Sequence, residues 1–185
     1  MTIFTPVDWS SLDDLVQLNR ALAARDWPLA TKSYDAQKNI NDRTQLTKEE
    51  AASFGYAEEV IPTITSRIGS VLKTPRPLGT QLDLSGTYLR AADWTGIDLS
   101  AANLEGAYFL DIDLHGVELA NVTRFSGLKM QTTIWWEAKL ISKPLLEFLT
   151  AKFPFEKGTL YGPRYEQYDQ AGYDAALARL TSRLK

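Results

Sequence analysis

The chain has 185 residues, and its 20 lysines and arginines against 23 aspartates and glutamates give a formal net charge of −3 at pH 7. This balance excludes a generally basic nucleic-acid binder, and the lack of cysteine excludes disulfide and thiol chemistry. No apolar run approaches the ~20 residues of a membrane-spanning helix, and the first residues do not resemble a signal peptide. We therefore expect a cytoplasmic protein.

Residues 1–77 are predicted to form an N-terminal helical cap and a linker. Ser11 can cap a first helix, whose apolar stripe consists of Leu12, Leu15, Val16, Leu18 and Leu22. The polar tract 39–47 predicts a loop, and the run Thr47–Glu50 has the spacing of a capping box for a further helix.

After Pro62, a second apolar face has helical spacing and consists of Ile64, Ile68, Val71 and Leu72. The run Thr74–Pro77 that follows contains two prolines, which lack backbone donors and favour extended structure. We interpret this run as the linker into the next part of the chain.

From Leu82 to Asn121 a five-residue unit recurs eight times, as LDLSG, TYLRA, ADWTG, IDLSA, ANLEG, AYFLD, IDLHG and VELAN. Neither helices nor strands have a period of five, so the period indicates a solenoid. The first position is small or aliphatic and the fifth is Gly, Ala, Asp or Asn, which suits corners. The third position is large and apolar, and we expect all eight of its residues inside: Leu84, Leu89, Trp94, Leu99, Leu104, Phe109, Leu114 and Leu119.

These units resemble the pentapeptide repeat family, whose consensus is Ala-Asp/Asn-Leu-x-x and which Ala102–Gly106 matches directly. The resemblance implies a bacterial protein and a right-handed quadrilateral β-helix, in which each unit forms one side and four units complete a coil. The expected fold is therefore a mainly β solenoid of about three coils with helical caps. Residues 78–137 would form the β-helix, and the whole chain one compact domain.

Four sides per coil would stack residues that are twenty apart. Tyr88 would then lie on Tyr108, and the acids would form two adjacent columns, Asp93 on Asp113 and Asp98 on Glu118. The repeat register fails after Asn121 unless one residue is inserted, so we expect a bulge near Val122. In the shifted frame the inward residues are Phe125, Met130 and Trp135, the small sites are Thr123, Leu128 and Thr133, and Gly127 is a corner.

Residues 138–185 are predicted to form a C-terminal helical cap, because an open solenoid end would expose apolar side chains and unpaired backbone. Ser142 can cap a helix that carries Leu145, Leu146, Phe148 and Leu149. Trp136 is either covered by this cap or part of a dimer surface. The last helix carries an apolar stripe, which either docks on the chain or forms a homodimer: Tyr173, Leu177, Leu180 and Leu184.

The sequence offers little for catalysis. It contains no Walker loop, no GxGxxG and no GxSxG motif, and its single histidine, His115, excludes a site that needs two. His115 falls at an outward position, where we expect it to be exposed. Stacked Asp93 and Asp113 could share a proton as a catalytic dyad, or could simply face solvent as the repeat consensus requires. We expect no enzyme, no metal and no cofactor.

The acids concentrate in the repeats. Residues 82–121 hold seven acids and a single base, Arg90, a net charge of −6 that leaves +3 for the flanks. Tyr88 and Tyr108 could stabilise the sheet or anchor a partner. The candidate partner-binding residues are Tyr88, Tyr108, Asp93, Asp98, Asp113 and Glu118.

Two functions follow from these features. The favoured hypothesis is a non-enzymatic module that binds a protein partner, such as a toxin in an immunity pair. The alternative comes from the resemblance, because the best-known pentapeptide repeat proteins mimic B-DNA, bind gyrase and confer quinolone resistance. Three coils would rise about 15 Å, or about four base-pair steps, which is short for a duplex mimic. Neither hypothesis involves direct nucleic-acid or membrane binding.

Overall fold

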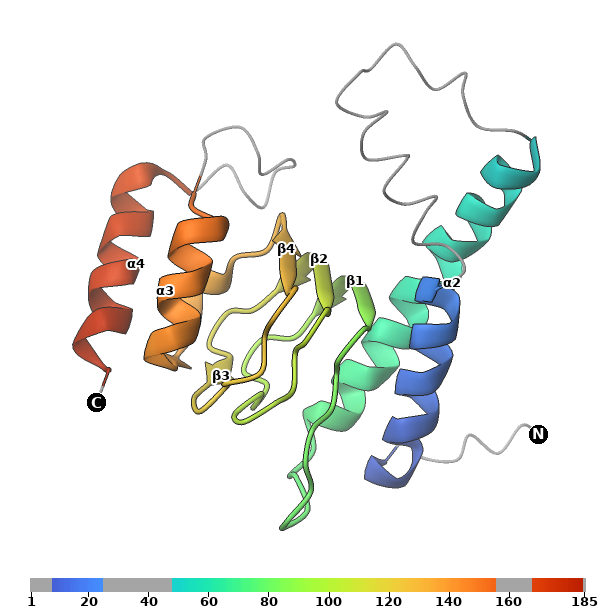
Figure 1. Cartoon of the computed structure of the whole chain (residues 1–185), viewed down its shortest axis with the longest axis horizontal. Helices are drawn as coiled ribbons and strands as arrows, with labels where there is room; N and C mark the ends of the chain where they lie inside the picture. Colours follow the sequence, from blue (N-terminus) through green and yellow to red (C-terminus); the bar gives the residue numbers. More distant parts are fainter. Residues whose placement is uncertain (1–7, 25–47, 156–167, 185) are drawn as a thin grey trace.

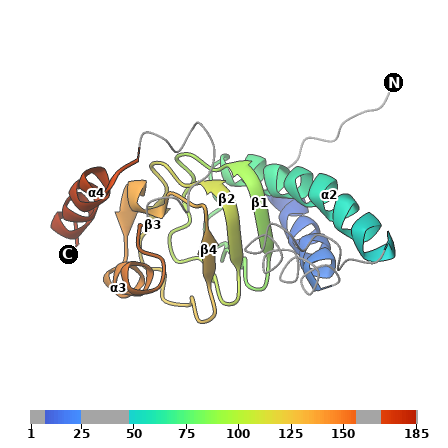
Figure 2. The same cartoon turned by 90° about the horizontal axis from the view of Figure 1, so that it is seen from above.

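A computed structural model describes residues 8–24, 48–155 and 168–184 of the chain. Short parallel strands form two small sheets, and helices lie at both ends of this β structure (Figures 1 and 2). The three-stranded sheet has the order β1 (Tyr88–Asp93), β2 (Tyr108–Asp113) and β4 (Lys129–Gln131). The second sheet pairs β3 (Glu118–Leu119) with β5 (Leu140–Ile141).

Strands β1 and β2 pair residues that are twenty apart in the sequence. Tyr88 lies opposite Tyr108 and Asp93 opposite Asp113, and isolated bridges join Asp83 to Asn103 and Asp98 to Glu118. All of these pairings are parallel. The predicted columns are therefore confirmed at three places along the twenty-residue period.

The core follows the five-residue pattern. All eight third-position residues, from Leu84 to Leu119, are 0% exposed, which confirms the predicted register. The first-position residues are buried as well. Two large rings meet in the middle of this core, where Trp94 contacts Phe109 edge to face with 5.7 Å between the ring centroids.

The fifth position of every unit has a positive φ angle. These residues include four that are not glycine: Ala91 at 51°, Ala101 at 57°, Asp111 at 56° and Asn121 at 56°. The chain turns here through a left-handed conformation that glycine adopts freely and other residues adopt at a cost. The small or turn-forming residues at this position are thus explained by the backbone, as the sequence predicts.

The predicted insertion is confirmed, and the structure corrects its details. Beyond β3 the register lengthens by one residue, so that Asn103 pairs with Arg124. Val122 is fully buried at the small inward site, whereas Thr123, expected there, is exposed. The cause is that the extra residue follows Val122 instead of preceding it. Parallel pairing then continues to β5, beyond residue 137.

The other residues of the shifted frame mostly follow the prediction. Met130, Trp135, Leu128 and Thr133 are buried, and Gly127 has φ of 71°. Phe125 differs because it is only half-buried, and its ring packs against Phe148 with 5.2 Å between centroids.

Two helices cover the β1 end of the sheet: residues 12–24, which follow a short 3₁₀ turn η1 (Trp9–Ser11), and α2 (Lys48–Leu72). Asp8 is the N-cap of η1, and its carboxylate accepts from the Ser10 amide. Ser11 lies within η1 and its hydroxyl donates to the Asp8 carbonyl, so the prediction that Ser11 is a cap is wrong. Helix α2 begins at Lys48, within the run predicted as a capping box, and is continuous through Pro62. The helical face expected beyond this proline is buried. Residues 39–47 lie outside the described residues.

Side chains of these helices bond to the free edge of the first strand. Asn19 donates to the Tyr88 carbonyl at 2.7 Å and accepts from the Tyr88 amide at 2.8 Å. The hydroxyl of Thr65 accepts from the Arg90 amide at 3.1 Å. Just before the strand, Arg20 donates to the Ser85 carbonyl at 2.6 Å. These bonds replace those that a neighbouring strand would make, and the helices thereby close an edge that would otherwise template aggregation.

At the other end, a short 3₁₀ turn η3 (Trp135–Glu137) is followed by α3 (Lys143–Lys152) and α4 (Gln170–Ser182). Trp136 is 3% exposed and contacts Tyr173 with 5.2 Å between ring centroids, so the interpretation of Trp136 as part of the cap is confirmed. Ser142 occupies the N-cap position of α3, but its hydroxyl donates to the Val122 carbonyl at 2.7 Å instead of capping the helix.

Candidate interaction surface

The tyrosine column is not an exposed ladder. The rings of Tyr88 and Tyr108 stack with 5.3 Å between centroids, but Tyr88 is only 4% exposed. It is covered by Ala23 and by Ile61 of α2, and the Tyr108 hydroxyl bonds to the side chain of Gln131. The expectation that Tyr88 is available to a partner is therefore wrong, because the N-terminal helices pack on it.

The aspartates at the second position of the repeat units each accept a hydrogen bond within their own turn. The Asp93 carboxylate accepts from the Thr95 amide at 2.8 Å, Asp98 accepts from Ser100 at 2.8 Å, and Asp113 accepts from His115 at 3.0 Å. Asp and Asn form such turns readily because a short side chain reaches the amide two residues on. This explains why acids occupy the second position, without any need for a catalytic dyad.

The same bonds act on the acidity of these groups. Hydrogen bonds from the side chain and the backbone of Thr95 lower the pKa of Asp93 below its ordinary value. Partial burial of Asp98 acts to raise its pKa, but the hydrogen bonds from Ser100 and the charge of Arg76 outweigh burial, so the pKa is lowered. Both groups are therefore ionised at neutral pH.

Basic residues of the flanks lie on the repeat acids. Lys73 is 3.7 Å from Asp93, Arg76 is 3.9 Å from Asp98, and Lys139 is 2.6 Å from Glu118. By composition the repeats are anionic and the flanks cationic, and these contacts bring the two kinds of charge together. The surface over the repeats consequently carries mixed charge.

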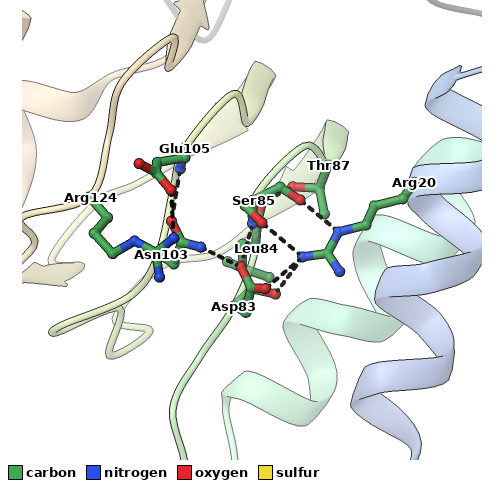
Figure 3. A network of polar contacts seen from close by, with 8 residues as sticks. All are labelled: Arg20, Asp83, Leu84, Ser85, Thr87, Asn103, Glu105 and Arg124. Atoms are coloured by element: carbon green, nitrogen blue, oxygen red, sulfur yellow. Dashed lines mark hydrogen bonds and ion pairs between the residues drawn. The ribbon is translucent and has the colours of Figure 1, made fainter.

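Figure 3 shows the most extensive of these polar networks. Arg20 is 3.1 Å from Asp83 and also donates to the hydroxyl of Ser85 at 3.1 Å. Asp83 in turn accepts from the side chain of Asn103 at 2.8 Å. On the same side of the repeats Arg124 bonds to Glu105 at 2.6 Å. This side is thus occupied by contacts within the chain.

His115 is exposed, as predicted, and lies between two carboxylates. Its Nδ1 is 3.6 Å from Asp113 and its Nε2 is 4.0 Å from Glu137, which also accepts from Arg179 at 2.7 Å. The two acids face different ring nitrogens. Among the described residues no group of three or more His, Cys, Asp or Glu side chains could hold a metal ion.

The apolar stripe of the last helix packs within the chain. Tyr173 is 4% exposed and contacts the rings of Trp135 and Trp136, and Leu180 is 2% exposed. Leu177 and Leu184 are half-buried. Docking, one of the two predicted uses of the stripe, is therefore what α4 does, and the stripe does not present a continuous free face for a second copy.

The remaining candidates form what we call the acidic strip, which consists of Asp93, Asp98, Asp113 and Glu118. The side chains of Asp93 and Asp98 are 66% and 54% exposed, and those of Asp113 and Glu118 are less so. The linker between α2 and β1 lies beside the strip, because Lys73 and Arg76 reach it from there. This linker was not identified as part of a site from the sequence.

Residues 83–121 match the family model of the pentapeptide repeats in eight copies. Comparisons with curated proteins and with solved structures gave no match. The match to this family suggests a protein-interaction module, and pentapeptide repeat proteins are generally non-enzymatic. In the described part of the chain, no helix is both long and apolar enough to cross a membrane.

Proposed function

We propose that this protein is a non-enzymatic interaction module, whose repeats form a right-handed quadrilateral β-helix and whose acidic strip binds a protein partner. The observation that carries the proposal is the fixed geometry of the strip. Asp93 and Asp113 are held in register by strand pairing, and each is oriented by a hydrogen bond within its own turn. Such a surface is ordered before binding, so its own side chains lose less conformational entropy when a partner binds.

The ion pairs favour a partner protein with a surface of mixed charge over gyrase, which would have to bind the strip as a mimic of DNA. A DNA mimic has to present unneutralised negative charge, whereas Asp93, Asp98 and Glu118 each have a basic neighbour. A protein surface with charges of both signs complements such a pattern and gains specificity from it. An immunity-type binder that occupies a toxin is one variety of this proposal.

The test has to remove charge without breaking turns. Asp→Asn keeps the side-chain oxygen that accepts from the amide two residues on, whereas Asp→Lys would remove it. The test variant therefore combines D93N, D98N, D113N and E118Q. A matched control removes four exposed acids elsewhere: D13N, D14N, E147Q and D174N.

The wild-type chain and both variants are tested in two assays. In the first, gyrase supercoiling is measured with and without a quinolone, and we expect no effect of any chain. In the second, a partner co-purified from the native host is identified, purified and titrated. We expect the strip variant to lose affinity and the control to keep it. Rescue of gyrase by the wild type would favour the alternative, and equal affinities would exclude the strip.

A further inference from the structure

The linker between α2 and β1 contains a leucine in an unusual position. Leu78 is 104% exposed, so its side chain packs against nothing in the described part of the chain. Figure 1 shows this linker projecting beyond the helices and the sheet. Single exposed leucines are common on protein surfaces, so the case for Leu78 rests on how it is held.

The backbone around Leu78 is a defined turn. The amide of Thr80 donates to the carbonyl of Pro77 at 3.2 Å, and Gly79 between them has φ of 80°. A positive φ at the third residue makes this a type II turn, which places Leu78 at the second residue. Turn chemistry favours proline there and does not call for leucine.

The turn is also fastened to the repeats. Arg76 donates to the carbonyls of Ser100 at 2.8 Å and Asp98 at 2.5 Å. Pro75 and Pro77 on either side of it restrict the backbone further. The backbone that carries Leu78 therefore has few alternative conformations, so little conformational entropy would be lost on binding. This is the property of a preorganised binding element.

We propose that Leu78 is the anchor residue of the protein-binding surface, inserting into an apolar pocket of a partner protein. The proposal rests on the proposed function, since the pocket belongs to the protein that binds the acidic strip. The charge next to the turn indicates the rim of that pocket. Asp98 is 54% exposed whereas Arg76 is 19% exposed, so the acid meets the partner and a basic rim complements it.

The experiment places a photo-crosslinking benzophenone amino acid in the full chain, at residue 78, 118 or 18. Leu18 is the matched control, because it is the other large hydrophobic side chain exposed among the described residues, at 50%, and it lies on the N-terminal helix. The chains are irradiated in cells of the native host. The protein crosslinked through residue 78 is identified, purified and titrated with the wild type, L78S and L18S.

We expect one discrete protein to crosslink through residues 78 and 118 and not through residue 18. Burying a leucine side chain contributes enough for L78S to weaken binding about tenfold to hundredfold, while L18S should bind within about twofold of the wild type. Matching thermal melts of the three chains would show that the fold is intact.

The outcomes separate the two proposals. Crosslinks through residue 118 alone, or equal affinity of L78S and the wild type, would overturn the role of Leu78 and leave the interaction module standing. No crosslink through either residue would overturn both. If the chain sediments with anionic phospholipid vesicles and L78S does not, the proposed role of Leu78 would also be overturned, because the leucine would then enter a membrane.

Discussion

Asn19 and Tyr88 are joined by two hydrogen bonds, through which one side chain satisfies both the amide and the carbonyl of a strand residue 69 positions away. Asn19 is 0% exposed, so solvent does not reach these two hydrogen bonds. A carboxamide carries a donor and an acceptor side by side, which matches the carbonyl and the amide of a strand residue. The bonds attach the N-terminal helix to the repeats.

Asn19→Ala is therefore expected to destabilise the protein by about 2–4 kcal/mol, since two buried backbone groups lose their partners. Urea unfolding followed by circular dichroism measures this change. Gln17→Ala, at an exposed position of the same helix, is the control and should stay within about 0.5 kcal/mol of the wild type. Equal stability of the two variants would mean that the helix does not hold the edge.

Replacing each of two adjacent alanines by glycine should change the stability of the protein in opposite directions. Ala101 has φ of 57°, and relief of this left-handed strain exceeds the added flexibility of the unfolded chain, so Ala101→Gly should stabilise by about 0.5–1 kcal/mol. Ala102 is buried at an inward site, and Ala102→Gly should destabilise by about 1–2 kcal/mol. The midpoints of chemical unfolding should therefore move apart. A loss of stability in both variants would contradict the corner conformation.

Leu180→Asp tests whether the stripe of α4 works inside the chain. The side chain is 2% exposed, and a buried, unpaired carboxylate should cost about 3 kcal/mol or more. Ala178→Asp, at an exposed position of the same helix, should have little effect. Thermal melts and light scattering are run on the same samples. A folded Leu180→Asp chain with half the mass of the wild type would show that the stripe joins two copies.

Acid should weaken the contribution of Asp93. Its pKa is lowered in the folded state, chiefly by the hydrogen bonds of Thr95. The stability that ionised Asp93 adds is therefore fully present above the unfolded-state pKa of about 3.9, and is lost as the pH falls through the lower folded-state value. Asp93→Asn keeps the turn and removes the titration.

The measurement compares the free energies of unfolding of the wild type and Asp93→Asn at neutral pH and through the acid range. We expect the wild type to be the more stable at neutral pH and its advantage to shrink below about pH 4. A difference that does not depend on pH would show that the carboxylate and the amide serve the turn equally well.

The interior and the corners of the repeats could be predicted because the five-residue period is local. Each unit places the same kind of residue in the same environment, and eight copies average out the exceptions. Trp94, for example, could be assigned to the core from its position in the unit alone, and Ala101 to a corner. Even the extra residue near Val122 was visible as a break in the period.

The ends and the surface were decided by tertiary structure. Tyr88 occupies an outward position of its unit, yet the N-terminal helices bury it. Asp98 is also at an outward position, and the sequence does not show that Arg76 of the linker pairs with it. A Cβ on Gly69 would come within 2.6 Å of Trp94, but glycine within a helix gives no sign of this contact. Such contacts join single residues far apart in the chain and repeat nowhere. Periodicity therefore determines which side chains point inward, while long-range packing determines which outward ones remain free.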